Sequence, residues 1–139
     1  MQVQPYLNFD GLTEEALAFY GKALGGKVTM LMRMNESPEP HPPGMVPPGA
    51  ELKVMHAAFQ VGGTVLLASD MKCGGKPRFE GITMSLQVGS DAEATRCYSA
   101  LAEGGKVGMP LAKTFFASSF GTLTDRFGLS WMIMAGPTN

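Results

Sequence analysis

The sequence predicts an α+β fold in which two βαβββ modules form curled mixed sheets around a cleft. The first observation behind this prediction is an internal repeat, because Glu-Ala-x-x-x-Tyr at residues 15–20 recurs at residues 93–98. Likewise, Gly-Gly-Lys-Val at 25–28 recurs at 104–107. The second observation is that both halves show one strand pattern, one helical pattern and three further strand patterns in the same order. The third is a single proline-rich stretch that accounts for the greater length of the first half.

The first half opens with a strand over residues 3–9, where apolar and polar side chains alternate loosely. Asp10-Gly11 ends this strand, and a helix follows with Thr13 as its N-cap. An apolar stripe at helical spacing runs from Ala16 to Leu24, and Gly25-Gly26 ends the helix. The three strands that complete the module are expected at residues 28–34, 52–61 and 64–69.

Residues 35–50 are predicted to form a loop inserted into the first module. This segment holds six of the ten prolines in the chain, and proline interrupts both helices and sheets. A proline-stiffened loop of this length inside a compact domain is often functional. We expect it either to lie over the cleft as a lid or to cover a dimer seam.

The second half repeats the plan with a strand over residues 81–88 and a helix capped by Ser90 or Asp91. This helix is expected to end near residue 103. The remaining strands are expected at residues 106–109, 115–124 and 129–135. Together the halves are predicted to form a single domain over residues 1–139, with modules at about 1–72 and 79–139.

Composition excludes several classes of protein. Hydrophobic residues make up 45% of the chain and charged residues 17%, which is typical of a folded domain. Eleven basic residues face twelve acidic ones, so no nucleic-acid partner is predicted. No apolar run reaches the roughly 18 residues of a membrane span, and the N-terminus lacks the pattern of a signal peptide. We therefore expect a cytoplasmic protein in which Cys73 and Cys97 are free thiols.

Three segments resemble the PhnB-like group of the glyoxalase/bleomycin-resistance/extradiol-dioxygenase superfamily, also called the vicinal oxygen chelate superfamily. They are Pro5–Phe9, Glu14–Tyr20 and Asp125–Ile133, and the resemblance covers nearly the whole chain. It implies the two-module fold, a ligand-binding cleft and a homodimer. Some members of the group carry the name 3-demethylubiquinone 3-methyltransferase, but this sequence lacks a glycine-rich strand–loop–helix motif for a nucleotide-type cofactor.

Enzymes of the superfamily commonly bind one divalent metal through His, Gln or Glu side chains on the first and fourth strands of each module. The resemblance implies that the corresponding positions in this chain are Pro5, Leu67, Thr83 and Met132. None of these side chains is a normal ligand for a divalent cation. Nearby positions on the same strands offer Ser69 or Gln87, which adds no carboxylate or imidazole. No metal and no other cofactor is therefore predicted.

The cleft is expected to be apolar with a few hydroxyl groups and one amide, which suits a small and moderately apolar ligand. His56 either faces this cleft and binds the ligand or forms a hydrogen bond at a sheet face or interface. Arg33 either clamps an anionic ligand or is a solvated edge residue. The predicted ligand-binding residues are Leu7, Phe9, Arg33, His56, Leu67, Ser69, Thr83, Ser85, Gln87, Ser130 and Met132.

Other candidate groups have weaker patterns. His41, Glu51 and Asp70 have no metal-ligand spacing relative to His56. The pair Ser118-Ser119 lacks the surroundings of a catalytic nucleophile. The candidates near the end of the first module are Cys73, which is either a reactive thiol or part of an exposed loop, and Gly74-Gly75-Lys76, which lacks the context of a phosphate loop.

Three functions follow from these observations, and no catalytic residue is predicted. The leading hypothesis is a metal-independent protein that binds a small molecule in an apolar cleft. The second is a lyase- or dioxygenase-type enzyme with a non-standard site, for example around His56. The third is a structural dimeric domain without a ligand.

Overall fold

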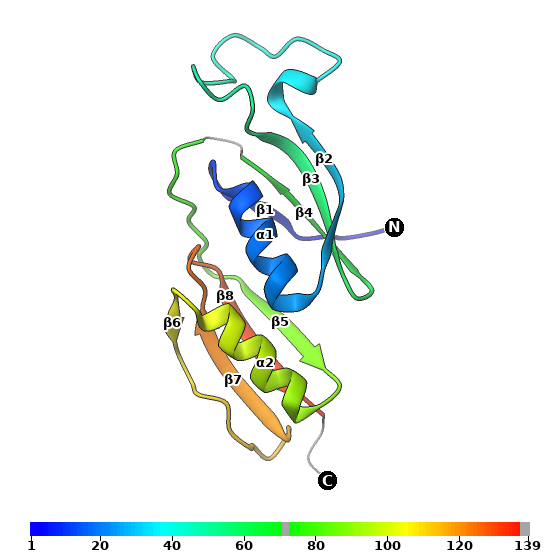
Figure 1. Ribbon diagram of the computed structural model, residues 1–139, viewed down its shortest axis with the longest axis vertical. Coiled ribbons are helices and arrows are strands. Elements are labelled where there is room, and N and C mark those ends of the chain that lie inside the picture. The colour runs from blue at the N-terminus through cyan, green and yellow to red at the C-terminus, as the bar shows by residue number, and fades with distance from the viewer. Residues whose placement is uncertain (71–72, 137–139) are drawn as a thin grey trace. The chain divides into compact units, whose positions relative to one another are not determined.

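The computed structural model describes residues 1–70 and 73–136, which form two compact units, Met1–Pro77 and Arg78–Asn139 (Figure 1). Both units contain a helix and a four-stranded sheet, so the repeated βαβββ plan is confirmed. The union of the two units into a single domain stays a prediction. No helix in the described part of the chain has the length and apolar character needed to cross a membrane.

The sheet of the first unit has the strand order β1-β4-β3-β2. β1 pairs with β4 in parallel, and the other neighbours are antiparallel. A short 3₁₀ helix, Met34–Glu36, follows β2 at the start of the proline-rich segment. The elements of this unit are β1 (Tyr6–Asn8), α1 (Thr13–Leu24), β2 (Lys27–Arg33), β3 (Val54–Val61) and β4 (Thr64–Ser69).

The sheet of the second unit has the equivalent order β5-β8-β7-β6, again with a parallel first pair. Its elements are β5 (Thr83–Val88), α2 (Asp91–Ala102), β6 (Lys106–Val107), β7 (Ser119–Thr124) and β8 (Ser130–Ala135). The predicted strand over 115–124 is therefore too long at its start. Residues 114–117 turn instead, because the Thr114 hydroxyl accepts the backbone N–H groups of Phe116 and Ala117.

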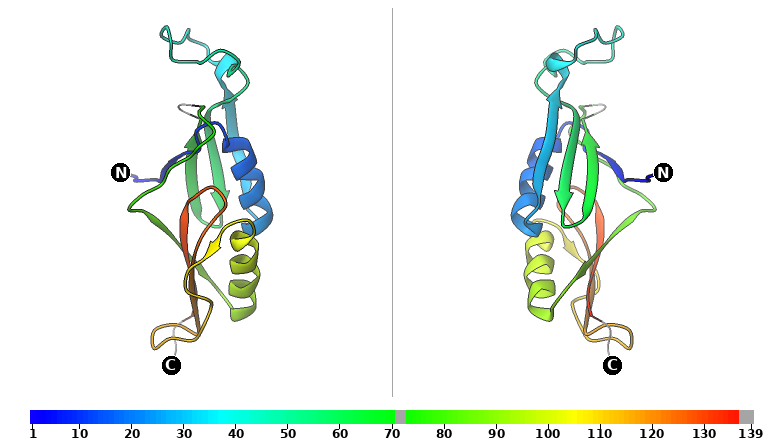
Figure 2. Two further views of the ribbon diagram at one scale, coloured as in Figure 1. Left: turned by 90° about the vertical axis from the view of Figure 1, so that its left-hand side faces the viewer. Right: turned by 90° about the vertical axis from the view of Figure 1, so that its right-hand side faces the viewer.

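Each helix lies against one face of its own sheet, as Figure 2 shows. In the first unit, Tyr20 of α1 is 1% exposed and contacts the ring of Phe9, with 6.0 Å between ring centroids. In the second unit, Leu101 of α2 and Ile133 of β8 are fully buried. Apolar burial between helix and sheet supplies the main stabilisation of each unit.

The opposite face of each sheet is not covered by the helix of its own unit. The strand register assigns its side chains, because paired residues point to the same side. We call these surfaces the first and second open faces. The first open face carries Tyr6, Asn8, Lys27, Met30, Met32, His56, Ala58, Gln60, Val65, Leu67 and Ser69. The second open face carries Thr83, Ser85, Gln87, Phe120, Thr122, Thr124, Ser130, Met132 and Met134.

The buried Asp70 carboxylate connects three segments of the first unit. Its Oδ1 accepts the N–H groups of Gly11 and Thr13, and its Oδ2 accepts that of Val54, each at 2.9 Å. The prediction that Thr13 caps α1 is therefore wrong. Thr13 is the first helical residue, no side chain at Leu12 provides a cap, and Asp70 supplies an acceptor from the end of β4. In α2, by contrast, the predicted cap is confirmed at Ser90, whose hydroxyl accepts the N–H of Glu93.

The second unit has its own buried carboxylate at Asp125, in the turn between β7 and β8. Asp125 Oδ1 accepts the N–H groups of Phe127 and Leu129, and Oδ2 accepts the indole N–H of Trp131 at 2.9 Å. The turn that closes this hairpin is thus held by a side chain from within it. Because Trp131 is the one tryptophan of the chain, its fluorescence reports on this unit.

The proline-rich segment contains two tight turns of the same sequence, Pro-Pro-Gly. The N–H of Met45 donates to the carbonyl of Pro42, and that of Ala50 donates to the carbonyl of Pro47. The third residues of these turns, Gly44 and Gly49, have φ values of 81° and 84°. Proline followed by a glycine of positive φ is the arrangement of a type II turn, so the local sequence determines the path of this loop.

Removal of the Asp70 carboxylate tests its role in the first unit. We expect Asp70→Ala to lower the free energy of unfolding by about 3 kcal/mol, because three buried N–H groups lose a charged acceptor. Asp70→Asn keeps one acceptor oxygen, so its free energy of unfolding should lie between those of the wild-type protein and Asp70→Ala. Urea denaturation followed by far-UV circular dichroism measures the change. Glu39→Ala, at an exposed carboxylate, is the control and should stay within about 0.5 kcal/mol. A loss below about 1 kcal/mol in Asp70→Ala would contradict this role.

A methyl group at Gly105 should destabilise the second unit. A Cβ there would overlap the carbonyl oxygen of Thr124 and lie 2.9 Å from the backbone of Asp125. We expect Gly105→Ala to lower the free energy of unfolding by about 2 kcal/mol or more, measured by denaturation with Trp131 fluorescence. Gly89→Ala is the matched control, because its nearest neighbour is a flexible side chain at 3.9 Å. Equal stability of the two variants would contradict the prediction.

Candidate functional site

The first open face carries a hydrogen-bonded tyrosine–histidine pair in apolar surroundings. The Tyr6 hydroxyl lies 3.0 Å from Nδ1 of His56, and the two ring centroids are 5.6 Å apart. The two residues belong to β1 and β3, which flank β4 in the sheet, and Leu67 of β4 pairs with Tyr6 on the same face. His56 is paired across the sheet with Met32 of β2. Of the two interpretations of His56, the hydrogen bond at a sheet face is therefore observed, and ligand binding stays a prediction.

Two large side chains of this face are exposed to solvent. Tyr6 is 49% exposed and Met30 is 40% exposed, while Leu67 and Met32 are half-buried. Methionine side chains are flexible and polarisable, so they adapt to the shape of a bound molecule. The first open face thus combines an adaptable apolar surface with a polar pair at one position.

The predicted orientation of the first strand is wrong. Leu7 and Phe9 were expected to line the cleft, but they are 4% and 0% exposed and pack in the core beneath α1. Phe9 contacts Tyr20 of α1, and Leu7 is paired with the buried Ala68. A shift of one residue along a strand reverses the face. Tyr6 therefore takes the position on the open face, and this functional candidate was missed.

Arg33 lies apart from the first open face. Its guanidinium forms two hydrogen bonds of 2.8 Å with the Glu14 carboxylate of α1 and a third with the carbonyl of Leu52. The hydrogen bond from Arg33 lowers the pKa of Glu14. A groove of about 450 Å³ lies beside this pair and also includes Lys53. The Arg33 side chain is therefore directed toward α1 and Leu52. Anion binding by Arg33 stays a prediction.

Ser69 is another predicted cleft residue, and the register assigns it to the first open face, but it is buried there. Its side chain is 2% exposed, and its hydroxyl has no hydrogen-bond partner among the described residues. Ser69 pairs with Asn8 at the end of the parallel β1–β4 ladder. Its distance from solvent argues against contact with a ligand.

The other predicted site residues share the second open face. Thr83, Ser85 and Gln87 are exposed on β5, and Ser130 and Met132 are half-buried on the neighbouring β8. The register pairs Thr83 with Ser130 and Ser85 with Met132, so these groups form one continuous surface. Ligand binding at these residues stays a prediction, as does a cleft formed jointly by the two open faces.

The four positions at which the resemblance implies metal ligands do not fit a divalent cation in this chain. Pro5, Leu67 and Met132 offer no oxygen or nitrogen side-chain donor, and Thr83 offers one hydroxyl. In the described ranges 1–70 and 73–136, no three or more His, Cys, Asp or Glu side chains are grouped so that they could hold a metal ion. We therefore derive no chemical step through a metal.

Ser118 and Ser119 are structural in this arrangement. Both hydroxyls donate to Oδ1 of Asp91, at 2.6 and 2.9 Å, and thereby tie the start of β7 to the first turn of α2. These hydrogen bonds, that of Ser118 above all, lower the pKa of Asp91. A serine nucleophile needs a neighbouring base that accepts its proton. An exposed aspartate with a lowered pKa does not suit that role.

The surroundings of Cys73 argue against a reactive thiol. Its Sγ–H donates to the carbonyl of Asp70 at 3.0 Å, and burial, followed by the negative charge of Asp70, raises the pKa of the thiol. A reactive cysteine requires a lowered pKa. The flanking Lys72 lies outside the described residues. Cys73 and Cys97 are both free, as predicted.

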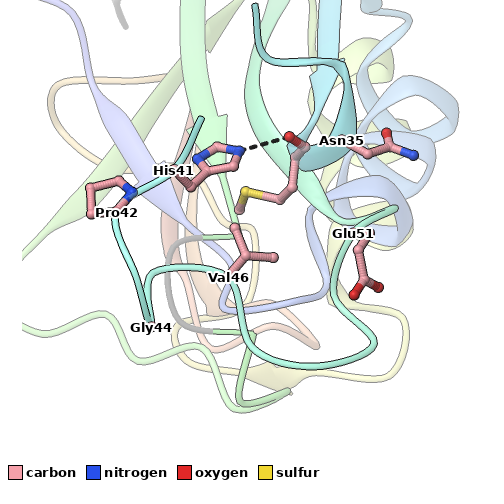
Figure 3. Close-up of a pocket in the computed structure, with 7 residues that line it drawn as sticks. Asn35, His41, Pro42, Gly44, Val46 and Glu51 are labelled. Carbon is pink, nitrogen blue, oxygen red and sulfur yellow. Dashed lines mark hydrogen bonds between the residues drawn. The ribbon is translucent and has the colours of Figure 1, made fainter. Parts of the chain in front are cut away.

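The proline-rich segment encloses a small pocket of its own, drawn in Figure 3, with a volume of about 310 Å³. Nε2 of His41 donates to the carbonyl oxygen of Met34 at 2.7 Å, so the histidine fastens the loop to the 3₁₀ helix. Asn35 and Glu51 point away from the space between His41 and Val46 in this view. Asn35, His41 and Glu51 nevertheless all line the pocket. The role of the segment as lid or dimer cover stays a prediction.

The comparisons with known proteins agree with the fold and the sequence motifs. Residues 1–134 match the family model described as 3-demethylubiquinone-9 3-methyltransferase. Protein YjdN of Escherichia coli is 34% identical, over 96% of this chain and 94% of its own length. The structure of PA1353 from Pseudomonas aeruginosa is 43% identical, covers 97% of each chain and has a TM-score of 0.82.

Two further structures define the wider group. A putative 3-demethylubiquinone-9 3-methyltransferase, PhnB protein, from Bacillus cereus is 25% identical over 98% of this chain and all of its own, with a TM-score of 0.78. A glyoxylase/bleomycin resistance protein/dioxygenase domain from Frankia shares the fold at 15% identity, with a TM-score of 0.64 and coverage of 97% and 94%. The chain therefore belongs to the PhnB-like 3-demethylubiquinone-9 3-methyltransferase family, which has the glyoxalase/bleomycin-resistance fold.

Proposed function

We propose that this protein binds a small apolar molecule on the first open face without a metal ion. The observation that carries the proposal is the exposure of Met30 and Tyr6, at 40% and 49%, on a sheet face that no helix of its unit covers. Burying an apolar side chain of this size against a ligand contributes about 1 to 2 kcal/mol. An adaptable apolar surface with one polar pair is the usual composition of a small-molecule site.

Methyl transfer, the activity in the family description, is not part of the proposed function. Nucleotide-type cofactors are commonly held at the free N-terminus of a helix after a strand. In this chain the Asp70 carboxylate already accepts N–H groups at the start of α1, and Ser90 caps α2. The glycine pair Gly62-Gly63 joins two strands and precedes no helix.

Titration with a neutral fluorescent naphthylamine, N-phenyl-1-naphthylamine, tests the proposed binding. We expect saturable binding that shifts the ¹³C-labelled methyl signals of Met30 and Met32 and leaves that of Met45, in the proline-rich segment, unchanged. Met30→Lys should weaken binding by about tenfold, because it adds a charge to the apolar contact.

The matched control is Val28→Lys. Val28 is 43% exposed on the same strand but pairs with the buried Phe59, so it belongs to the opposite face. Binding that fails to saturate, or that both variants weaken equally, would contradict a specific site on the first open face.

We also propose that the chain forms a homodimer. The support is an exposed aromatic pair in the second unit, because Phe115 and Phe116 are 92% and 41% exposed with ring centroids 5.1 Å apart. A second copy that covers these rings would remove apolar surface from water. Light scattering after size exclusion should give twice the mass of the chain, and Phe115→Glu should shift the population toward monomer. A wild-type protein that elutes with the mass of one chain would contradict this assembly.

A further inference from the structure

The Tyr6–His56 pair leaves one nitrogen of the imidazole available. Nδ1 of His56 is engaged by the Tyr6 hydroxyl at 3.0 Å. Nε2 has no hydrogen-bond partner among the residues that the structure describes. The neighbours of His56 on the first open face are Met32, its cross-strand partner, Ala58, two residues along the strand, and Ser69 on the adjoining strand β4. By the strand register of the described residues, no carboxylate side chain lies on this face to compete for the free nitrogen.

The chemistry of the pair determines what this free nitrogen presents. A neutral imidazole has one N–H donor and one acceptor nitrogen, and a hydrogen bond at one nitrogen selects the tautomer. A phenol is a far stronger acid than the N–H of a neutral imidazole, and imidazole nitrogen is the better acceptor. The favourable arrangement therefore has the Tyr6 O–H donating to Nδ1. The proton of His56 is then on Nε2.

We propose that the Nε2–H of His56 donates a hydrogen bond to an acceptor oxygen of the ligand, a carbonyl or a carboxylate. The apolar body of the same ligand lies on Met30 and Met32. Tyr6 is a positioning residue, because it acts by fixing the tautomer of His56. This inference rests on the proposed function, since it selects one ligand class for the same surface.

This geometry discriminates between ligands by the polarity of their head group. A carboxylate or carbonyl accepts from Nε2–H and completes the hydrogen bonding of the histidine. An ammonium group carries donors alone, so it would face the N–H group without an acceptor. Specificity arises when the wrong head group leaves a polar group unpaired in the bound state. The site should thus favour apolar acids and ketones over apolar amines of the same shape.

The tautomer is tested first, without a ligand, by long-range ¹H–¹⁵N correlation spectra of the imidazole at pH 8, where an ordinary histidine is neutral. We expect His56 to show the Nε2–H form, and Tyr6→Phe to give a mixture of both forms. His41, the other histidine of the chain, is an internal reference whose pattern should not change. A His56 protonated on Nδ1 in the wild-type protein would overturn the inference.

The ligand class is tested with 2-naphthoate and 2-naphthylmethylammonium, which share one ring system and carry opposite head groups. We expect 2-naphthoate to bind about tenfold more tightly, which corresponds to one hydrogen bond to a charged acceptor. His56→Phe should abolish this preference. His56→Gln, which retains an N–H donor, should keep part of it.

The control for this substitution is His41→Phe, which makes the same change in the proline-rich segment and should leave the preference intact. Far-UV circular dichroism and Trp131 fluorescence establish that each variant is folded. If both probes bind equally and Met30→Lys weakens both, the proposed function stands and the inference fails. If neither probe binds and N-phenyl-1-naphthylamine does not bind either, the proposed function itself fails and the inference falls with it.

Discussion

The number of helices is the constraint on which the rest of this structure depends. Each four-stranded sheet has one helix of twelve residues, about 18 Å long, and such a helix can pack on one face of a sheet. The side chains on the other face must therefore either tolerate exposure to solvent or be buried against a further surface. The open faces mix methionine, aromatic and aliphatic side chains with amide, hydroxyl and imidazole groups, whereas the buried positions beneath the helices are almost all apolar. The open faces, and with them the candidate site, follow from this imbalance between helices and strands.

The architecture was predictable from the sequence because the two halves of the chain repeat the same motifs in the same order. The recurrence of Glu-Ala-x-x-x-Tyr and of Gly-Gly-Lys-Val fixes the position of each helix and of the strand after it. The spacing at which apolar residues recur then distinguishes a helix from a strand in segments of six residues or more, as in β4 and β8. The Pro-Pro-Gly turns were also accessible, since their conformation depends on adjacent residues.

The faces of short strands and the contacts between distant residues were not predictable in the same way. β1 has three residues, so alternation cannot decide whether Leu7 or Tyr6 faces the core. The Asp70 carboxylate caps a helix whose first residue lies 57 positions earlier in the chain. Tyr6 and His56 are separated by 50 residues and belong to strands that are not sequence neighbours. No local pattern records such a pairing, because it is created by the order of strands in the sheet.

The proline-rich segment lengthens the loop that the chain must close to form the first sheet. To form the parallel pair of the first unit, the chain must close a loop of 61 residues between Tyr6 and Leu67, against 47 between Thr83 and Ser130. Because closure entropy grows with the logarithm of loop length, the longer loop costs about 0.2 kcal/mol more. The two proline turns reduce even this difference, since they restrict the unfolded chain. The first unit thus carries an extra segment at almost no thermodynamic cost, while its sheet has the same topology as that of the second unit.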